Sequence, residues 1–331
     1  MSEYANVEHP FLEKLREIGW KVIDKGNGGI PKDPTETMRS SFDEVILKEE
    51  FFRMLSELNP WINEEQKKYC YDKIAKIDKT LIDANHEIHN LLLKGIPLLT
   101  KNEQTGEENP TARVINFSHY DSNSFIAINQ FRVNTNNTKP FIVPDIVCFV
   151  NGLPLIVIEC KDENVAEPMS EAFSQIQRYS NQRVIGDDFA DGLEEGCERL
   201  FHTNLFSVIT RGIEARCGTI TADFDFYHNW KDIFPEEYAD GINIEPNMRQ
   251  EILIKGMFNH EILIDILKNF TLYTQKGESY VKIICHYQQY RAVGKMIKKL
   301  QKGTDWRSRS GVIWHTQGSG KTALSYHLTY M

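Results

Sequence analysis

The chain has 331 residues, of which 41% are apolar and 26% are charged, so it is long and apolar enough to bury the core of a globular protein. No run of 18 apolar residues occurs, and the first residues lack a basic segment followed by an apolar one; both features disfavour a membrane protein or a secreted one and predict a cytoplasmic location. The net charge of −9 does not by itself favour a nucleic-acid partner.

The first hundred residues show the periodicity of helices. Apolar side chains recur at helical spacing from Glu8 to Ile18, and Trp20 to Ile23 then indicates a short extended segment. Further helices are predicted over residues 43–58, 62–78 and 83–94. We expect these helices to form one layer of the fold.

From about residue 112 the pattern changes to that of strands. Strands are predicted over Val114–Phe117, Phe125–Val133, Ile146–Val150, Leu153–Ile158, Leu205–Thr210 and Cys217–Asp223. A helix is predicted over residues 167–182, and the acidic stretch 186–198 reads as an exposed insertion. This order predicts an α/β fold with a sheet covered by helices.

The C-terminal part differs in charge from the rest. Residues 281–331 contain nine basic side chains and one acidic one, a balance of +8 that leaves −17 for the preceding residues. The change indicates a domain boundary near residue 278 and a basic piece able to meet phosphates, although a solvated lysine-rich helix face is the alternative. The elements predicted here are a strand at Tyr280–Cys285, a helix at Ala292–Leu300 and a strand at Gly311–Trp314.

A glycine-rich loop with a lysine follows the last predicted strand and precedes a final helix. In such a loop, backbone N–H groups can surround a polyphosphate, the lysine reaches the terminal phosphates and the hydroxyl holds Mg²⁺. A chance Lys-Thr after a glycine-rich turn is the alternative. The motif predicts an ATP site formed by Gly318, Ser319, Gly320, Lys321 and Thr322.

Gln289 stands before the C-terminal helix, where helicase-like ATPases place a glutamine that reads adenine. It is the candidate for this role, with an ordinary surface glutamine as the alternative. Only nine residues follow Thr322, so we expect poor ATP hydrolysis by this chain alone. Either the chain is the front of a longer protein or its motor is vestigial.

Acidic residues and a lysine stand at the ends of two predicted strands. Asp145 opens one strand, and Glu159 and Lys161 close the next, on one face by the strand period of two. Cleavage of a phosphodiester by water needs Mg²⁺ held by carboxylates and a lysine near the phosphate. These residues therefore predict a Mg²⁺-dependent catalytic site, and a plain salt bridge of Lys161 with both acids is the alternative.

The register of this predicted hairpin decides whether the two acids meet. A two-residue loop at Asn151-Gly152 pairs Asp145 with Ile158 and sends Asp145 and Glu159 to opposite faces. An odd loop pairs Asp145 with Val157 and leaves Glu159 diagonally beside it. Because a shared metal requires one face, we predict an odd-length loop or a β-bulge in this hairpin.

Three further residues are candidates for the same site. Gln175 and Tyr179 lie one turn apart on the following helix, where the amide can bind water or a phosphate oxygen and the hydroxyl can meet the DNA backbone. A polar helix face without function is the alternative. Glu8 lies on the apolar side of the first helix as a possible third metal carboxylate beside Asp145 and Glu159, or as an acid that interacts with the helix dipole.

Taken together, these motifs resemble the N-terminal part of the R subunit of type I restriction enzymes, from about Ser41 to the end of the chain. The matching pieces are Glu44-Val45-Ile46-Leu47, Leu58-Asn59-Pro60, Asn129-Gln130-Phe131, the block from Pro144 to Leu155, Glu159-Cys160-Lys161, Gln175-x-x-x-Tyr179 and the block from Trp314 to Thr322. The histidine before the glycine-rich loop also fits this family.

The resemblance implies a PD-(D/E)xK restriction-endonuclease-like mixed sheet flanked by helices over residues 1–275, followed at 276–331 by the start of a RecA-like ATP-binding lobe. It implies that Asp145, Glu159 and Lys161 cleave double-stranded DNA with Mg²⁺, without sequence specificity, after ATP-driven translocation, in a complex with modification and specificity subunits. Gln175 and Tyr179 would form the accessory motif. The alternative is a nucleotide- and DNA-binding module with a non-catalytic nuclease fold.

Overall fold

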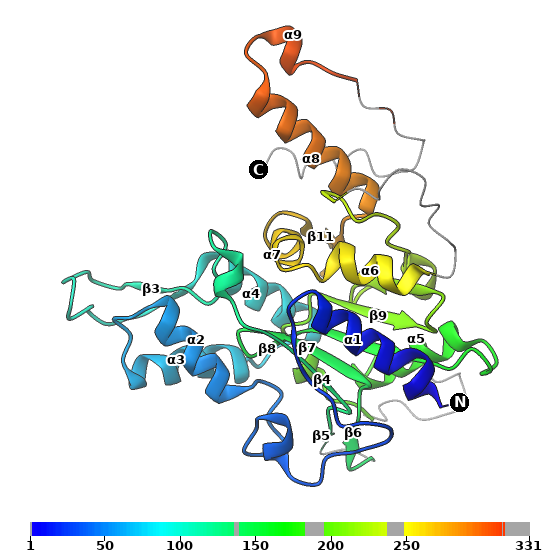
Figure 1. Ribbon diagram of the computed structural model, residues 1–331. Coiled ribbons are helices and arrows are strands. Elements are labelled where there is room, and N and C mark those ends of the chain that lie inside the picture. Colours follow the sequence, from blue (N-terminus) through cyan, green and yellow to red (C-terminus); the bar gives the residue numbers. More distant parts are fainter. Residues whose placement is uncertain (1, 136–138, 183–194, 237–247, 313, 315–331) are drawn as a thin grey trace.

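The computed structural model describes all residues except 1, 136–138, 183–194, 237–247, 313 and 315–331. Its centre is a mixed sheet of six strands in the order β1-β4-β7-β8-β9-β10 (Figure 1). Their bounds are β1 Lys21–Ile23, β4 Phe125–Asn129, β7 Ile146–Val150, β8 Leu153–Cys160, β9 Phe206–Thr210 and β10 Ala215–Gly218. The β1–β4 and β8–β9 pairs are parallel and the others are antiparallel, which confirms the expected α/β sheet.

Helices surround this sheet. The helices predicted up to residue 300 are confirmed with shifted ends, and the final helix predicted after Thr322 lies outside the described residues. Their bounds are α1 His9–Glu17, α2 Lys48–Leu58, α3 Glu64–Ala75, α4 Leu81–Lys94, α5 Pro168–Tyr179, α6 Arg249–Met257, α7 His260–Asn269, α8 Tyr287–Lys302 and α9 Trp306–Arg309. A short π-helix, Tyr4–Glu8, leads directly into α1. No helix of the described residues has the length and apolar character needed to cross a membrane.

The two faces of the sheet are covered by different helices. Phe206 of β9 meets the ring of Phe258, at the end of α6, edge to face, and Phe258 also meets Phe11 of α1. The neighbouring Ser207 points to the other face, where the nearby Tyr227 contacts Phe173 of α5. Helices α1 and α6 therefore cover one face and α5 the other.

The β7–β8 hairpin is the core of the sheet, since both strands are buried along their whole length. Its turn is Asn151-Gly152, and both residues have positive φ, +50° and +80°, as a two-residue turn between twisted strands requires. A Cβ on Gly152 would lie 2.6 Å from the carbonyl oxygen of Leu47. The turn therefore needs glycine both for its backbone conformation and for the close approach of the chain before α2.

The register of this hairpin confirms the predicted bulge. Val150 pairs with Leu153, but Cys148 pairs with Ile156 and Ile146 with Ile158, so β8 contains one extra residue opposite the Cys148/Phe149 step. The odd-length loop that would have paired Asp145 with Val157 is wrong. The turn keeps its two residues, so the extra residue that shifts the register lies inside β8 instead.

The strand predicted at Val114–Phe117 is wrong. Here side-chain amides take the place of a neighbouring strand: Asn151 donates to the carbonyl oxygen of Val114 over 2.8 Å, and Asn123 bonds both the N–H and the carbonyl of Asn116. The backbone groups are thus satisfied without a ladder. The two-residue β3, Thr111–Ala112, which ends just before this segment, pairs with β2, Ile96–Pro97.

Other predicted strands change their extent, among them the one predicted at Cys217–Asp223, which is β10, Ala215–Gly218. The run Phe125–Val133 is divided, since β4 ends at Asn129, Gln130 adopts a left-handed backbone, and β5, Val133–Asn134, pairs with β6, Phe141–Ile142. The strand predicted at Tyr280–Cys285 is confirmed as β12, Ser279–Ile284, but it pairs with β11, Thr271–Lys276, in a separate hairpin. Residue 276, where a second domain was expected to begin, is the last residue of β11.

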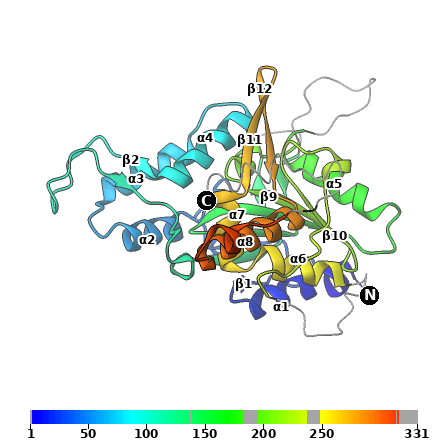
Figure 2. The same cartoon turned by 90° about the horizontal axis from the view of Figure 1, so that it is seen from above.

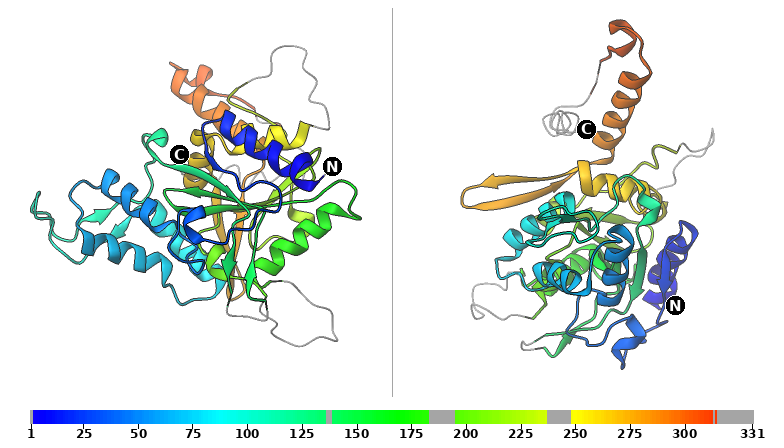
Figure 3. Two further views of the ribbon diagram at one scale, coloured as in Figure 1. Left: turned by 60° about the horizontal axis from the view of Figure 1, so that its bottom comes forward. Right: turned by 90° about the vertical axis from the view of Figure 1, so that its left-hand side faces the viewer.

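Figure 2 shows the β11–β12 hairpin pointing away from the body of the molecule, and the right-hand view of Figure 3 shows both this hairpin and α8 projecting from it. The hairpin packs against α4, where the His86 ring lies against Tyr273 of β11 and Tyr280 of β12. Helix α8 follows β12 directly, and only three of its side chains are buried, those of Gln289, Tyr290 and Val293.

Candidate functional site

Asp145 and Glu159 lie together at one end of the central hairpin. Ile146 pairs with Ile158, so one further step of the same register sets Asp145 opposite Glu159 and on the same face. The Asp145 carboxylate accepts a 2.7 Å hydrogen bond from the backbone N–H of Cys160. The bulge in β8 therefore brings the two acids together, although not by the diagonal placement that the sequence suggested.

Lys161 is bound to this pair of acids. Its Nζ donates to Oε1 of Glu159 over 2.7 Å and to the carbonyl oxygen of Cys160 over 3.0 Å. Burial alone would lower the pKa of Lys161, but the Glu159 and Asp145 carboxylates reverse this and raise the pKa above its usual value. The lysine is therefore a buried cation over the whole range of neutral pH.

The second oxygen of Glu159 differs from the first, which binds Lys161. Oε2 is buried, and no donor of the described residues bonds it. Burial raises the pKa of Glu159 to about 7, and Lys161 only partly opposes this effect. Burial and the nearby Glu159 likewise raise the pKa of Asp145 well above its usual range. The carboxylates are thus held where ionisation is costly without a further positive charge.

Glu8 belongs to the same cluster, as the last residue of the π-helix before α1. It is buried, accepts a 2.6 Å hydrogen bond from the amide of Asn129, and lies near enough to Asp145 for that charge to act on it. Burial is the main cause that raises the pKa of Glu8 to about 7. Its inward orientation does not fit the alternative of an exposed acid that only meets the helix dipole.

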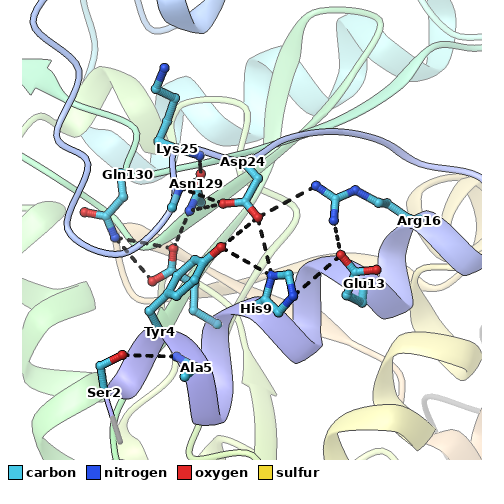
Figure 4. A network of polar contacts seen from close by, with 12 residues as sticks. Ser2, Tyr4, Ala5, His9, Glu13, Arg16, Asp24, Lys25, Asn129 and Gln130 are labelled. Carbon is cyan, nitrogen blue, oxygen red and sulfur yellow. Dashed lines mark hydrogen bonds and ion pairs between the residues drawn. The ribbon is translucent and has the colours of Figure 1, made fainter.

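Behind Glu8 lies a polar network that the sequence analysis did not assign (Figure 4). The Asn129 amide bridges Glu8 to Asp24, and Asp24 accepts a 2.9 Å hydrogen bond from the hydroxyl of Tyr4. The side-chain amide of Gln130 donates to both oxygens of Glu8. The matching piece Asn129-Gln130-Phe131 was a signal for these amides, but no sequence pattern assigned them a role.

Two residues of α5 complete the described site. Tyr179 is buried, and its hydroxyl donates to the carbonyl oxygen of Val143, two residues before Asp145. Gln175 lies one turn earlier on the same face and is partly exposed. The predicted helix thus brings Tyr179 to the cluster, where its hydroxyl supports the backbone that carries Asp145.

The donor set can be compared with what a divalent cation requires. Asp145, Glu159 and Glu8 supply oxygen atoms, which Mg²⁺ prefers as ligands. Among the described residues, Oε2 of Glu159 has no hydrogen-bond partner and could act as such a ligand. Three carboxylates against one lysine also leave an excess of buried negative charge that a divalent ion would balance. The chemistry fits Mg²⁺, yet within the described ranges no three acidic, histidine or cysteine side chains already form a metal cluster.

The C-terminal candidates have a different outcome. Gln289 is buried at the start of α8, and its amide oxygen accepts a 2.8 Å hydrogen bond from the N–H of His286, as in a capping box. The predicted nucleotide loop, Gly318 to Thr322, lies outside the described residues.

The chain is similar to known protein families in two regions. Residues 1–226 match the family model described as the type I restriction enzyme R protein N terminus. Residues 288–331 match the model of the SWI2/SNF2 ATPase. The first match contains the acidic cluster, and the second contains the glycine-rich loop.

Curated relatives show the same likeness. The chain is 28% identical over 96% of its length to the type I restriction enzyme HindI endonuclease subunit of Haemophilus influenzae, and 26% identical over 97% to a putative type I restriction enzyme endonuclease subunit, MjaIXP, of Methanocaldococcus jannaschii. A Staphylococcus aureus endonuclease subunit, SauMSSORF170P, is 24% identical over 98%. The chain spans 29%, 30% and 30% of these three relatives.

Proposed function

Because the chain belongs to the family of type I restriction enzyme R protein N termini, we propose that its central sheet is a PD-(D/E)xK nuclease that cleaves double-stranded DNA with Mg²⁺. The observation that carries this proposal is the buried cluster of Asp145, Glu159 and Lys161, in which Oε2 of Glu159 lacks a partner among the described residues. A cluster with uncompensated buried acids is costly to keep unless it serves a cation.

Asp145, Glu159 and Glu8 would hold the Mg²⁺. When bound, the ion supplies an activated water and offsets the negative charge that develops on the scissile phosphate. Lys161 acts as a fixed positive charge and hydrogen-bond donor beside that phosphate, since its raised pKa keeps the ammonium protonated. Proton removal from the water then falls to a carboxylate or to solvent, because a protonated lysine cannot accept the proton.

The residues of α5 have supporting roles in this proposal. Tyr179 keeps the Val143 carbonyl, and with it the segment before Asp145, at a fixed distance from the helix. Gln175 is partly exposed one turn away, so its amide can bind a water or a phosphate oxygen of the DNA.

The remaining residues belong to a motor in the proposed whole protein. Lys321, Thr322 and the preceding glycine-rich residues would bind the phosphates of ATP and Mg²⁺ as the first part of a RecA-like lobe, with Gln289 at the adenine. The whole protein would translocate DNA and then cut it without sequence specificity, in a cytoplasmic complex with modification and specificity subunits. The likeness of residues 288–331 to the SWI2/SNF2 ATPase supports this assignment.

A second candidate is a DNA- and nucleotide-binding module whose acids have only a structural role. Two observations favour it: Asp145 and Glu159 already have the Cys160 N–H and the Lys161 ammonium as partners, and no metal cluster is preformed in the described part of the chain.

Mn²⁺ binding separates the two candidates without any need for cleavage. Calorimetric titration of the 331-residue chain with Mn²⁺ in the absence of nucleotide should give one saturable site that Asp145→Ala abolishes and that Ser207→Ala, a buried change within the same sheet, leaves in place. Binding that is unaffected by Asp145→Ala would contradict the nuclease and favour the structural reading.

A further inference from the structure

Gln130 reaches two acidic residues of the cluster at once. Its backbone N–H donates to the carbonyl oxygen of Asp145 over 2.8 Å. Its side-chain amide donates to Oε1 and Oε2 of Glu8 over 3.4 and 3.3 Å. One residue therefore ties the N-terminal helical segment to the strand end that carries Asp145.

The backbone of Gln130 explains how this contact arises. Consecutive residues of a strand point to opposite faces, so Asn129 and Gln130 could not both reach Glu8 if β4 continued. At Gln130 the chain has φ +52°, the left-handed region, which is uncommon for a residue other than glycine. The turn ends β4 and brings both side-chain amides to one carboxylate. Such a backbone persists where the surrounding contacts determine it.

Asn129 fixes the other side of the same carboxylate. Its Oδ1 accepts a 2.6 Å hydrogen bond from the N–H of Lys25, so its NH₂ group must face Glu8 and Asp24, at 2.6 and 3.1 Å. Asn129 is fully buried and has no freedom to turn its amide. Glu8 is thus held by two donors from consecutive residues, which we name the amide clamp (Asn129 and Gln130).

We propose that Gln130 is a positioning residue of the nuclease site, which with Asn129 holds the Glu8 carboxylate toward Asp145 so that both can face one divalent cation. This inference rests on the proposed function. Gln130 acts through Glu8, as hydrogen-bond partners of metal-binding carboxylates do, and losses of such partners typically lower metal affinity by about 10 to 100-fold.

Two variants remove the clamp without straining the backbone. Gln130→Gly keeps the left-handed conformation and deletes the amide, and Gln130→Asn keeps an amide that is one methylene too short. Gln177→Ala, on the opposite side of α5 from Gln175, is the control. In Mn²⁺ titrations of the nucleotide-free chain, both Gln130 variants should lose about tenfold or more in affinity. The control should titrate like the unchanged chain.

A double-mutant comparison shows whether Gln130 acts through Glu8. Glu8→Gln should weaken Mn²⁺ binding, and adding Gln130→Gly to it should cause no further loss. In the metal-free chain, the midpoints of urea unfolding of the two single variants and the double variant should likewise be non-additive. The unfolding measurement needs no metal and tests the contact itself.

The outcomes are distinguishable. Three results would each overturn the clamp while leaving the nuclease proposal in place. They are full Mn²⁺ affinity in Gln130→Gly, a loss of Mn²⁺ affinity from Gln130→Gly that is equal with Glu8 and with Glu8→Gln, and additive unfolding midpoints. Mn²⁺ binding that Asp145→Ala does not change would overturn the nuclease proposal, and the metal role of the clamp with it.

Discussion

Lys161 and Lys282 are both almost fully buried, and their surroundings differ. Lys161 lies among carboxylates at the end of β8, whereas Lys282 of β12 donates its Nζ to the side-chain oxygen of Asn85 and the carbonyl oxygen of Asn204. No ion pair of Lys282 occurs within the described residues, and burial lowers its pKa well below the usual value. Acidic neighbours instead raise the pKa of Lys161.

Burial of a lysine therefore does not by itself mark a functional site. Around Lys282, the Asn85 amide also bonds the carbonyls of Phe201, His202 and Asn204, so the lysine completes a neutral polar contact that holds the β11–β12 hairpin to α4. Around Lys161, charge is in excess, and one oxygen of Glu159 has no partner in the part of the chain that the structure describes. Uncompensated charge, rather than burial, distinguishes the candidate site.

The largest effect is expected from replacing each lysine in turn. In the proposed whole protein with its proposed partner subunits, Lys161→Met should reduce DNA cleavage by about a thousandfold or more, because the variant loses the cation beside the negative charge that develops on the phosphate. Lys282→Met should leave the cleavage rate per folded molecule unchanged. The measurement is plasmid linearisation under single-turnover conditions, with ATP binding as the control for folding. Equal losses of cleavage in both variants would contradict the proposed difference between the two lysines.

Replacement of Glu8 is expected to increase the stability of the metal-free chain. Its pKa is about 7 in the folded chain and about 4.5 in the unfolded one, so the folded state binds more protons between these values and stability falls as the pH rises from 4.5 to 7. Glu8→Gln should therefore increase the free energy of metal-free unfolding at pH 8 by up to about 3 kcal/mol, with little gain at pH 4. Urea unfolding at the two pH values measures this, and a gain independent of pH would contradict it.

Lys282 gives the complementary pH dependence. Its pKa is lowered in the folded chain, so the unfolded state binds more protons below pH 10.5 and the stability contribution of the lysine rises with pH through that range. Lys282→Met also leaves the Asn204 carbonyl without this donor, at a cost of about 1–3 kcal/mol. The deficit of the variant should be larger at pH 9.5 than at pH 7 in chemical unfolding, and Lys276→Met, at the exposed end of β11, is the control.

The smallest effect is expected at Tyr179. Loss of its hydrogen bond to Val143 in Tyr179→Phe should cost about 1 kcal/mol of stability and reduce cleavage only modestly, because the ring still packs in the core. A loss of cleavage as large as that of Lys161→Met would mean that the hydroxyl meets the reacting phosphate instead.

Much of this architecture follows from local patterns. The hairpin strands were predictable because they are apolar throughout, and the bulge because two acids on one metal must share a face. The failed strand at Val114–Phe117 has the same apolar pattern, but its hydrogen bonds go to Asn123 and Asn151 from other segments. No local pattern reports such distant side-chain partners, and the amide clamp was out of reach for the same reason.

The bulge in β8 also limits how this region can vary. A two-residue turn alone would put Asp145 and Glu159 on opposite sides of the sheet, and the single extra residue opposite the Cys148/Phe149 step restores them to one side. The stretch between the two acids thus obeys an odd–even rule. Gain or loss of two residues preserves the meeting of the acids, whereas gain or loss of one separates them without altering either acid.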